Sequence, residues 1–206
     1  MELSLLDLGR FRPRRMAGPQ VFDGPSQVRA YWEALRKGAA IPDRAQLDPR
    51  GLGGVLDRVF LAERIAKGLV QVRIAGSALT EIAGTDLRGL PLSCLFTAEA
   101  RPLLAEALEA VAQGQAVVAL DLAQGTARTV AQLLLLPLQD GLNGRVVLGC
   151  LGTTGAVQPG KFDILRREEE RLGQPASLTN QVPKRAQVDL TVLRRVRHLS
   201  LVHTSD

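Results

Sequence analysis

The sequence predicts an α+β domain with a five-stranded antiparallel sheet and helices on one face. Strand-forming segments occur in a group of two and a group of three, and helical segments precede and separate the groups. Glycine-containing turns within each group favour antiparallel hairpins. We expect a flexible arm over residues 1–24, the domain over 25–155 and a basic tail over 156–206.

The first helix is predicted over residues 25–37, because apolar residues recur there at helical spacing. Pro25 suits the first helical position, where no backbone N–H is needed. A short helix is predicted over 49–56, since Asp48 is a good N-cap and Pro49 suits the position that follows.

The five strands are predicted from alternating or continuous apolar segments. In the second strand Val70, Val72 and Ile74 alternate with polar residues, which indicates one buried face. Leu133–Leu136 is an unbroken apolar run, typical of a central strand covered on both faces. In chain order, the strands and the long helix that separates their two groups are 59–65, 69–74, helix 98–113, 116–122, 129–138 and 146–151.

The composition is typical of a globular chain: 206 residues, 46% hydrophobic and 23% charged. Residues 25–155 hold 13 basic and 12 acidic side chains, so most of the net charge of +5 lies in the terminal segments. Only 3% of the residues are aromatic and the basic segment 184–197 has no helix-turn-helix pattern, so we do not expect nucleic-acid binding. No apolar run approaches the roughly 18 residues of a membrane span, so we expect no membrane contact.

Catalytic and metal-binding patterns are missing from the predicted domain. The only histidines, His198 and His203, lie in the tail, so no Ser-His-Asp or Cys-His arrangement can form in the domain. Cys94 and Cys150 match no metal-ligand spacing and suit a reducing compartment, which favours the cytoplasm. We therefore expect neither enzyme activity nor a metal site, and the sequence identifies no cofactor.

Several short motifs follow one another along the domain. The first is Tyr31-Trp32 in the N-terminal helix, and Pro42-x-Arg44 and Asp48-Pro49 come next. Over residues 28–152 the order and spacing of the motifs resemble a bacterial PAS-domain family whose members begin with a Tyr-Trp helix. The further matching residues are Arg73, Gly76, Gly84, Asp86, Gly89, Pro137 and Gly149.

We expect mostly structural roles for these motif residues. Arg44 would pair with Asp48 or another nearby carboxylate and fix the turn between them. Arg73 would pair with Asp86 or with an acidic residue on a neighbouring element. Gly76, Gly84 and Gly89 would allow backbone turns that a side chain would hinder.

The resemblance implies a PAS fold and a non-catalytic sensory or regulatory module, in which the sheet and its helices enclose a small apolar cavity. Alternatively, the chain is a ligand-free adaptor that acts by dimerisation through the helix over 25–37. Under both hypotheses we expect a homodimer and a protein partner in trans, with the tail segment 188–203, predicted as either helix or strand, as a docking element. The residues expected to line a ligand are Val72, Ile74, Phe96, Leu108, Leu134, Leu136 and Leu148.

Overall fold

The computed structural model describes most of the predicted domain and the first part of the predicted tail. The described residues are 22, 24–36, 38, 41–125, 128–141, 144–155 and 157–173. The predicted arm, apart from residues 22 and 24, and the tail segment 188–203 lie outside these ranges.

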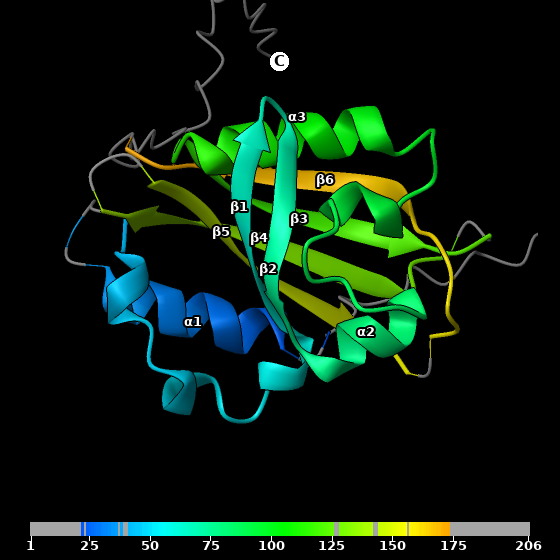
Figure 1. The fold of residues 1–206 in the computed structure, drawn as a ribbon, viewed down its shortest axis with the longest axis horizontal. Helices are drawn as coiled ribbons and strands as arrows, with labels where there is room; N and C mark the ends of the chain where they lie inside the picture. Colours follow the sequence, from blue (N-terminus) through cyan, green and yellow to red (C-terminus); the bar gives the residue numbers. More distant parts are fainter. Residues whose placement is uncertain are drawn as a thin grey trace, which may run out of the picture. The chain divides into compact units, whose positions relative to one another are not determined.

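The described residues form one antiparallel sheet of six strands in the order β2-β1-β5-β4-β3-β6 (Figure 1). The strands are β1 (Val59–Ala66), β2 (Leu69–Ala75), β3 (Ala116–Ala123), β4 (Ala131–Asp140), β5 (Gly144–Thr153) and β6 (Asp163–Arg171). The α-helices are α1 (Pro25–Leu35), α2 (Ser77–Ala83) and α3 (Arg101–Ala112). Short 3-10 helices are η1 (Arg44–Gln46), η2 (Pro49–Leu52), η3 (Leu56–Arg58) and η4 (Leu92–Leu95).

Both predicted groups of strands are confirmed, as β1–β2 and as β3–β4–β5. The two groups join through the antiparallel pairing of β1 with β5. β5 and β4 occupy the middle of the sheet, and the side chains of the run Leu133–Leu136 in β4 are all buried, as the continuous apolar pattern predicts.

A sixth strand, β6, corrects the prediction of a five-stranded sheet followed by a tail. The sequence pattern predicts that the charged residues 166–171 lie outside the domain, whereas they belong to a strand that pairs with β3 through eight residue pairs. Hydrophobic periodicity gives no sign of this strand, because most of its side chains are exposed charges. Strand pairing depends on backbone groups and does not require an apolar face.

Helices cover both faces of the sheet. On one face α2, α3 and η4 enclose the larger core, which includes Phe60, Leu104 and Leu120. On the opposite face α1 packs over β4 and β5 through Val28 and Trp32, and Leu52 of η2 belongs to the same core cluster (Figure 1). The prediction of helices on one face therefore holds for α2 and α3, and the N-terminal helix, which the prediction left unplaced, covers the other.

Trp32 holds α1 against the sheet, and its side chain is fully buried. The indole N–H donates to the carbonyl of Pro137 in β4 at 2.9 Å. The guanidinium groups of Arg29 and Arg36 lie over the indole ring, 5.5 and 4.9 Å from its centre. These arginines are three and four residues from Trp32, so they share its side of the helix and cover the ring with cation–π contacts.

Pro137 lies beyond the end of the pairing between β4 and β3. The pairing of the two strands ends at Leu135, while β4 continues to pair with β5. Proline has no N–H to offer a neighbouring strand, and at this position β3 no longer supplies a partner. Two residues further along, the Gln139 N–H donates to the Pro42 carbonyl, so this side of β4 is paired with α1 and the loop after it instead of a strand. Trp32 thereby satisfies a buried carbonyl at a place where the sheet has no strand to do so.

We expect Trp32→Phe to lower the free energy of unfolding by about 1–3 kcal/mol, because the Pro137 carbonyl loses its donor. The smaller ring also leaves a void, which acts in the same direction. Urea unfolding followed by circular dichroism measures the change, with Leu165→Ala, an exposed substitution on β6, as the control. A Trp32→Phe variant as stable as the control would show that this bond does not hold α1 to the sheet.

Candidate functional site

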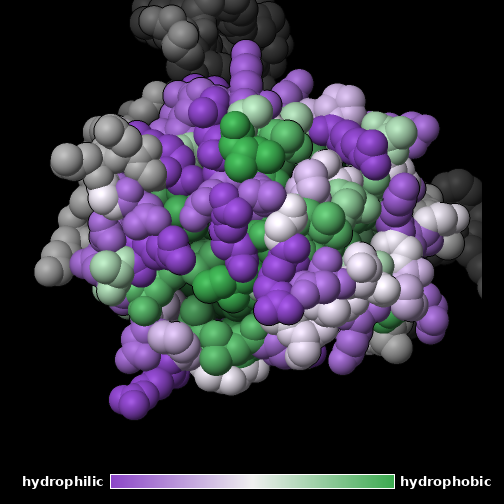
Figure 2. All heavy atoms as spheres, in the orientation of Figure 1, coloured by the Kyte–Doolittle hydropathy of each residue, from purple (hydrophilic) through white to green (hydrophobic). Residues whose placement is uncertain are grey.

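An apolar cavity of about 340 Å³ opens beside β1 and β2, on the face of the sheet that α1 covers. Strands β1, β2 and β5 form its floor, and the segment from η1 to η3 forms its wall. Figure 2 shows hydrophobic side chains gathered below the centre of the view, between hydrophilic ones. The lining residues are Arg44, Leu47, Pro49, Leu52, Leu56, Val59, Phe60, Leu61, Ile74, Ala75, Gly76 and Leu148.

The wall consists of short turns that are capped by their own side chains. In η1, Asp43 and Gln46 form a capping box. In η2, the Asp48 carboxylate accepts a hydrogen bond from the Arg50 backbone N–H at 2.9 Å, which confirms the predicted cap. The single helix predicted over 49–56 is instead the 3-10 turn η2 followed by the start of η3, because the glycines in this segment disfavour a continuous helix.

Tyr31 connects this wall to α1. Its hydroxyl accepts a hydrogen bond from the Asp48 backbone N–H at 2.7 Å and donates to the Asp48 carbonyl at 3.1 Å. Its ring lies against Gly51, where a Cβ atom would be 2.3 Å from Tyr31 Cε2. The Tyr-Trp pair of the sequence motif therefore makes two attachments: Trp32 binds the sheet, and Tyr31 binds the cavity wall.

The floor is a row of aliphatic side chains across three strands. Leu61 in β1 is the register partner of both Ile74 in β2 and Leu148 in β5. The side chain of Leu148 is fully buried, whereas Ile74 is 52% exposed. The cavity thus leaves a large apolar side chain uncovered at its β2 end.

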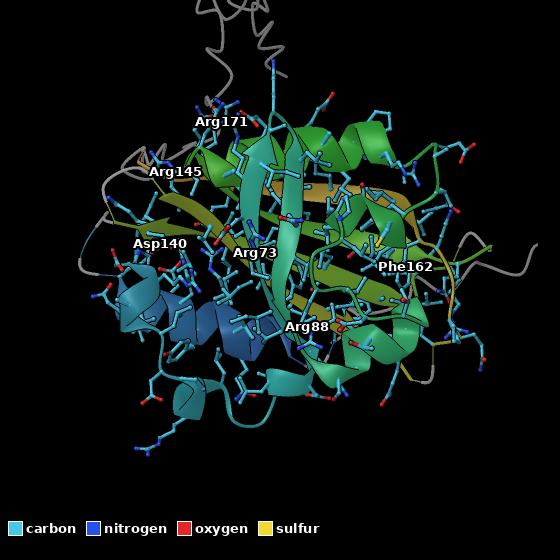
Figure 3. All side chains as sticks on the ribbon, in the orientation of Figure 1. Arg73, Arg88, Asp140, Arg145, Phe162 and Arg171 are labelled. Atoms are coloured by element: carbon cyan, nitrogen blue, oxygen red, sulfur yellow. The ribbon has the colours of Figure 1, made fainter. Side chains whose placement is uncertain are left out.

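A chain of alternating charges lies at the rim of the cavity. Arg44 approaches Asp140 at 3.0 Å and Glu63 at 3.8 Å, and Glu63 pairs with Arg73 at 2.7 Å. Figure 3 labels Arg73 and Asp140, the two ends of this chain. Arg44 therefore pairs with carboxylates other than Asp48, and it contributes the one charged side chain among the described lining residues. Partly exposed pairs of this kind each contribute at most about 1 kcal/mol.

The motif residues from Gly84 to Gly89 form turns and a local ion pair rather than part of the cavity. Both glycines have positive φ, 66° and 81°, a conformation that favours glycine. The predicted pairing of Arg73 with Asp86 is wrong, and the alternative, an acid on a neighbouring strand, is confirmed. Asp86 accepts hydrogen bonds from the Arg88 side chain and backbone N–H, which lower the pKa of Asp86 to about 2.

Two further motif glycines allow close packing around the floor. A Cβ atom on Gly149 would lie 2.0 Å from the ring of Phe60 on the adjacent strand. A Cβ atom on Gly76, which lines the cavity, would lie 2.2 Å from the Asp57 carbonyl oxygen. Both glycines are therefore structural, but they allow close approach of neighbouring groups; Gly76 has an extended backbone rather than the expected turn.

The seven predicted ligand residues do not converge on one cavity, so that prediction is wrong. The core between the sheet and α3 contains Val72, Phe96 and Leu108. The core on the α1 face contains Leu134, Leu136 and Leu148. Of the seven, Ile74 and Leu148 line the described cavity. The prediction grouped apolar residues by strand and helix, whereas the sheet separates them onto its two faces.

Sequence reasoning missed most of the cavity wall. Leu47, Leu52 and Leu56 lie in a glycine- and proline-containing segment without regular helical or strand periodicity. The one sequence feature that could have identified these leucines is their spacing of four or five positions, which is compatible with burial of one side of the segment. Glu63 and Asp140 were also missed, because their pairing with Arg44 depends on the sheet register and on the loop after α1.

Potential metal ligands and thiols are the reactive groups to consider among the described residues. The described residues contain no cluster of three or more potential metal ligands. Burial raises the pKa of the Cys150 thiol to about 12, and burial likewise raises the pKa of Cys94. Both thiols are protonated near neutral pH, which makes them poor nucleophiles.

Comparison with known families assigns the fold. A family profile described as PAS domain matches residues 23–152. The chain belongs to the PAS-domain family. PAS domains are in general sensory or regulatory modules, and the matched span of this one runs from α1 into β5 and leaves β6 outside. No curated protein and no solved structure gives a match to the chain. Within the part of the PAS-domain chain that the structure describes, every helix is too short or too polar to span a bilayer.

We expect Gly51→Ala to destabilise this PAS domain by about 1–3 kcal/mol, because the added methyl group would overlap the Tyr31 ring. Gly53→Ala is the matched control: its Cβ atom would meet only the Arg50 carbonyl, at 3.4 Å, on a helical backbone. The control should leave stability unchanged or raise it by less than about 1 kcal/mol. Urea unfolding compares the two variants, and equal losses in both would contradict a specific contact between Tyr31 and Gly51.

Proposed function

We propose that this PAS-domain chain is a non-catalytic regulatory module that binds a small apolar ligand in the cavity beside β1 and β2 and signals through protein contacts. The cavity itself carries the proposal: it has a volume of about 340 Å³ and an almost entirely apolar lining. Small-molecule sites commonly span roughly 300–1,000 Å³ and combine apolar walls with few polar groups. The two free thiols are in keeping with the reducing cytoplasm as its location.

Ile74 and Arg44 indicate the kind of ligand. A molecule that covers the exposed half of Ile74 would remove apolar surface from water, and complete burial of such a side chain is worth about 1.5–3 kcal/mol. Arg44 at the rim would face a single polar or anionic group on the ligand. The ligand would therefore have an apolar body and at most one polar end.

Occupancy of the cavity would be transmitted to α1. The wall residue Leu52 belongs to the core beneath α1, and Tyr31 holds the neighbouring Asp48 by two hydrogen bonds. A ligand that displaces η2 would therefore change the position of Tyr31 and of the helix that carries it. This route gives a partner protein a surface on which to sense the ligand.

A second candidate, a ligand-free adaptor, is favoured by the core on the opposite face. There Phe96, Leu104 and Leu108 are each 1% exposed and pack between the sheet and α3. These side chains fill the space between the sheet and the helices, where the sequence predicted a ligand cavity. In the adaptor, apolar side chains of a partner protein would cover Ile74 in place of a free ligand.

Native mass spectrometry of the purified chain tests these two functions. We expect one small molecule to be retained per chain and to be lost from Ile74→Glu, because a carboxylate in an apolar cavity is costly to desolvate. Ile65→Glu is the matched control: Ile65 lies on β1, is 49% exposed and does not line the cavity. This control should retain the molecule.

Titration with the apolar fluorophore 8-anilinonaphthalene-1-sulfonate covers the case in which the ligand is lost during purification. Binding that Ile74→Glu weakens by about tenfold or more, a free-energy change of about 1.4 kcal/mol, supports the ligand site, provided that Ile65→Glu binds as the unaltered chain does. A chain that retains no molecule and does not bind the fluorophore would overturn ligand binding and leave the adaptor.

A further inference from the structure

The two edges of the sheet differ in how their backbone is covered. At the β2 edge, the Val72 N–H donates to the Leu90 carbonyl and the Val72 carbonyl accepts from the Gly89 N–H, so a loop covers the strand. At the opposite edge, β6 pairs with β3 on one side, and no described segment pairs with its other side. An uncovered strand edge is a ready template for a further strand.

The direction of the unpaired backbone groups follows from one hydrogen bond. Just beyond β6, the Leu172 N–H donates to the Gln115 carbonyl, which precedes β3. Because backbone groups alternate in direction along a strand, even-numbered residues of this part of β6 turn toward β3. Arg167, Glu169 and Arg171 therefore direct their backbone groups away from the sheet; Figure 3 labels Arg171, the last residue of the strand.

The charges along this edge are arranged with opposite signs about Glu168. Arg166 and Arg167 precede it, and Glu169 and Glu170 follow it. In an antiparallel pair of two β6 strands centred on Glu168, Arg166 lies opposite Glu170 of the other copy and Arg167 lies opposite Glu169. A parallel, in-register pair would instead place arginine opposite arginine and glutamate opposite glutamate. Opposite charges directly across from each other stabilise a strand pair, and like charges weaken it.

This register also agrees with the direction of the backbone. It places Arg167 opposite Glu169 of the other copy, and both residues turn their backbone groups outward, so the two can exchange hydrogen bonds. It places Glu168 opposite the same residue of the other copy, at a position without hydrogen bonds. Two copies of this edge can form hydrogen bonds only in a register in which residues whose backbone groups face outward lie opposite each other.

We propose that two copies of this chain associate through their β6 edges, antiparallel and centred on Glu168, so that two six-stranded sheets become one. The side chains of this edge already have partners on both faces: Arg167 reaches Glu106 of α3 at 3.4 Å, and Glu170 reaches Arg29 of α1 at 2.9 Å. In the dimer Arg167 and Glu170 each lie between their own partner and an opposite charge of the second copy, and the two Glu168 residues are the like-charge contact at the centre.

This interface differs from the dimer contact expected from the sequence, the helix over 25–37. Val28 and Trp32 of α1 are fully buried against the sheet and unavailable to a second copy. The β6 edge requires no such rearrangement, because its side chains are exposed or partly exposed charges and its outward backbone groups meet no described segment.

A disulfide test reads the register directly. Residues opposite each other at a position without hydrogen bonds have Cα atoms about 4.5 Å apart, within the range of a disulfide. We expect Glu168→Cys to form a disulfide-linked dimer under mild oxidation. Glu170→Cys, on the same face of the strand, should not, because its counterpart in the other copy lies four residues away along the strand. The unaltered chain measures the background of cross-linking through Cys94 and Cys150. Equal cross-linking of the two variants would overturn this register.

Sedimentation equilibrium tests the association itself at low salt. We expect a monomer–dimer equilibrium that Arg167→Glu weakens by about tenfold or more and that the exchange Arg167→Glu with Glu169→Arg restores. Both variants lose the pairing of residue 167 with Glu106, so that contact does not distinguish them. A chain that stays monomeric at several hundred micromolar, or a dimer that Arg167→Glu leaves unchanged, would overturn the proposal.

Discussion

The hydrogen bond from the Trp32 indole to the Pro137 carbonyl is the contact on which the α1 side of this PAS domain depends. β4 extends past its pairing with β3, and a proline there cannot donate to a neighbouring strand. The indole provides the missing partner and fixes the position of α1. Once α1 is fixed, Tyr31 can hold Asp48, and the wall of the cavity follows from that attachment.

α1 also links the proposed ligand site to the proposed interface between copies. Within four residues it carries Arg29, which reaches Glu170 on β6, Tyr31, which holds the cavity wall, and Trp32, which binds β4. A shift of the helix would therefore change a contact at the cavity and a contact beside the β6 edge together. Such a coupling between two sites needs a shared element with more than one position, and α1 is the element that touches both.

Sequence reasoning predicted the elements well where their patterns are regular. The alternation in β2, the apolar run of β4 and the helical spacing of α1 each led to the correct element, because one-sided or two-sided burial leaves a period in the sequence. The alternation was wrong about Ile74, which lies at the cavity instead of in the core with Val70 and Val72, since the register of β1 and β2 shifts between Leu61 and Ala62. Sequence reasoning failed for β6, whose pairing with β3 uses backbone groups and leaves no apolar pattern. It also failed for the candidate site: Ile74 and Leu148 were included, but the wall leucines, Leu52 among them, lie in irregular turns.

The sequence by itself determined the PAS fold, the two groups of strands and the structural use of the Tyr-Trp motif. These properties depend on local propensity and periodic burial, which neighbouring residues encode. Only the tertiary structure decided which face of the sheet each apolar residue occupies, that Arg44 pairs with Asp140, and that a charged segment completes the sheet at β6. Those outcomes depend on strand register and on contacts between residues far apart in the chain, and no local pattern specifies them.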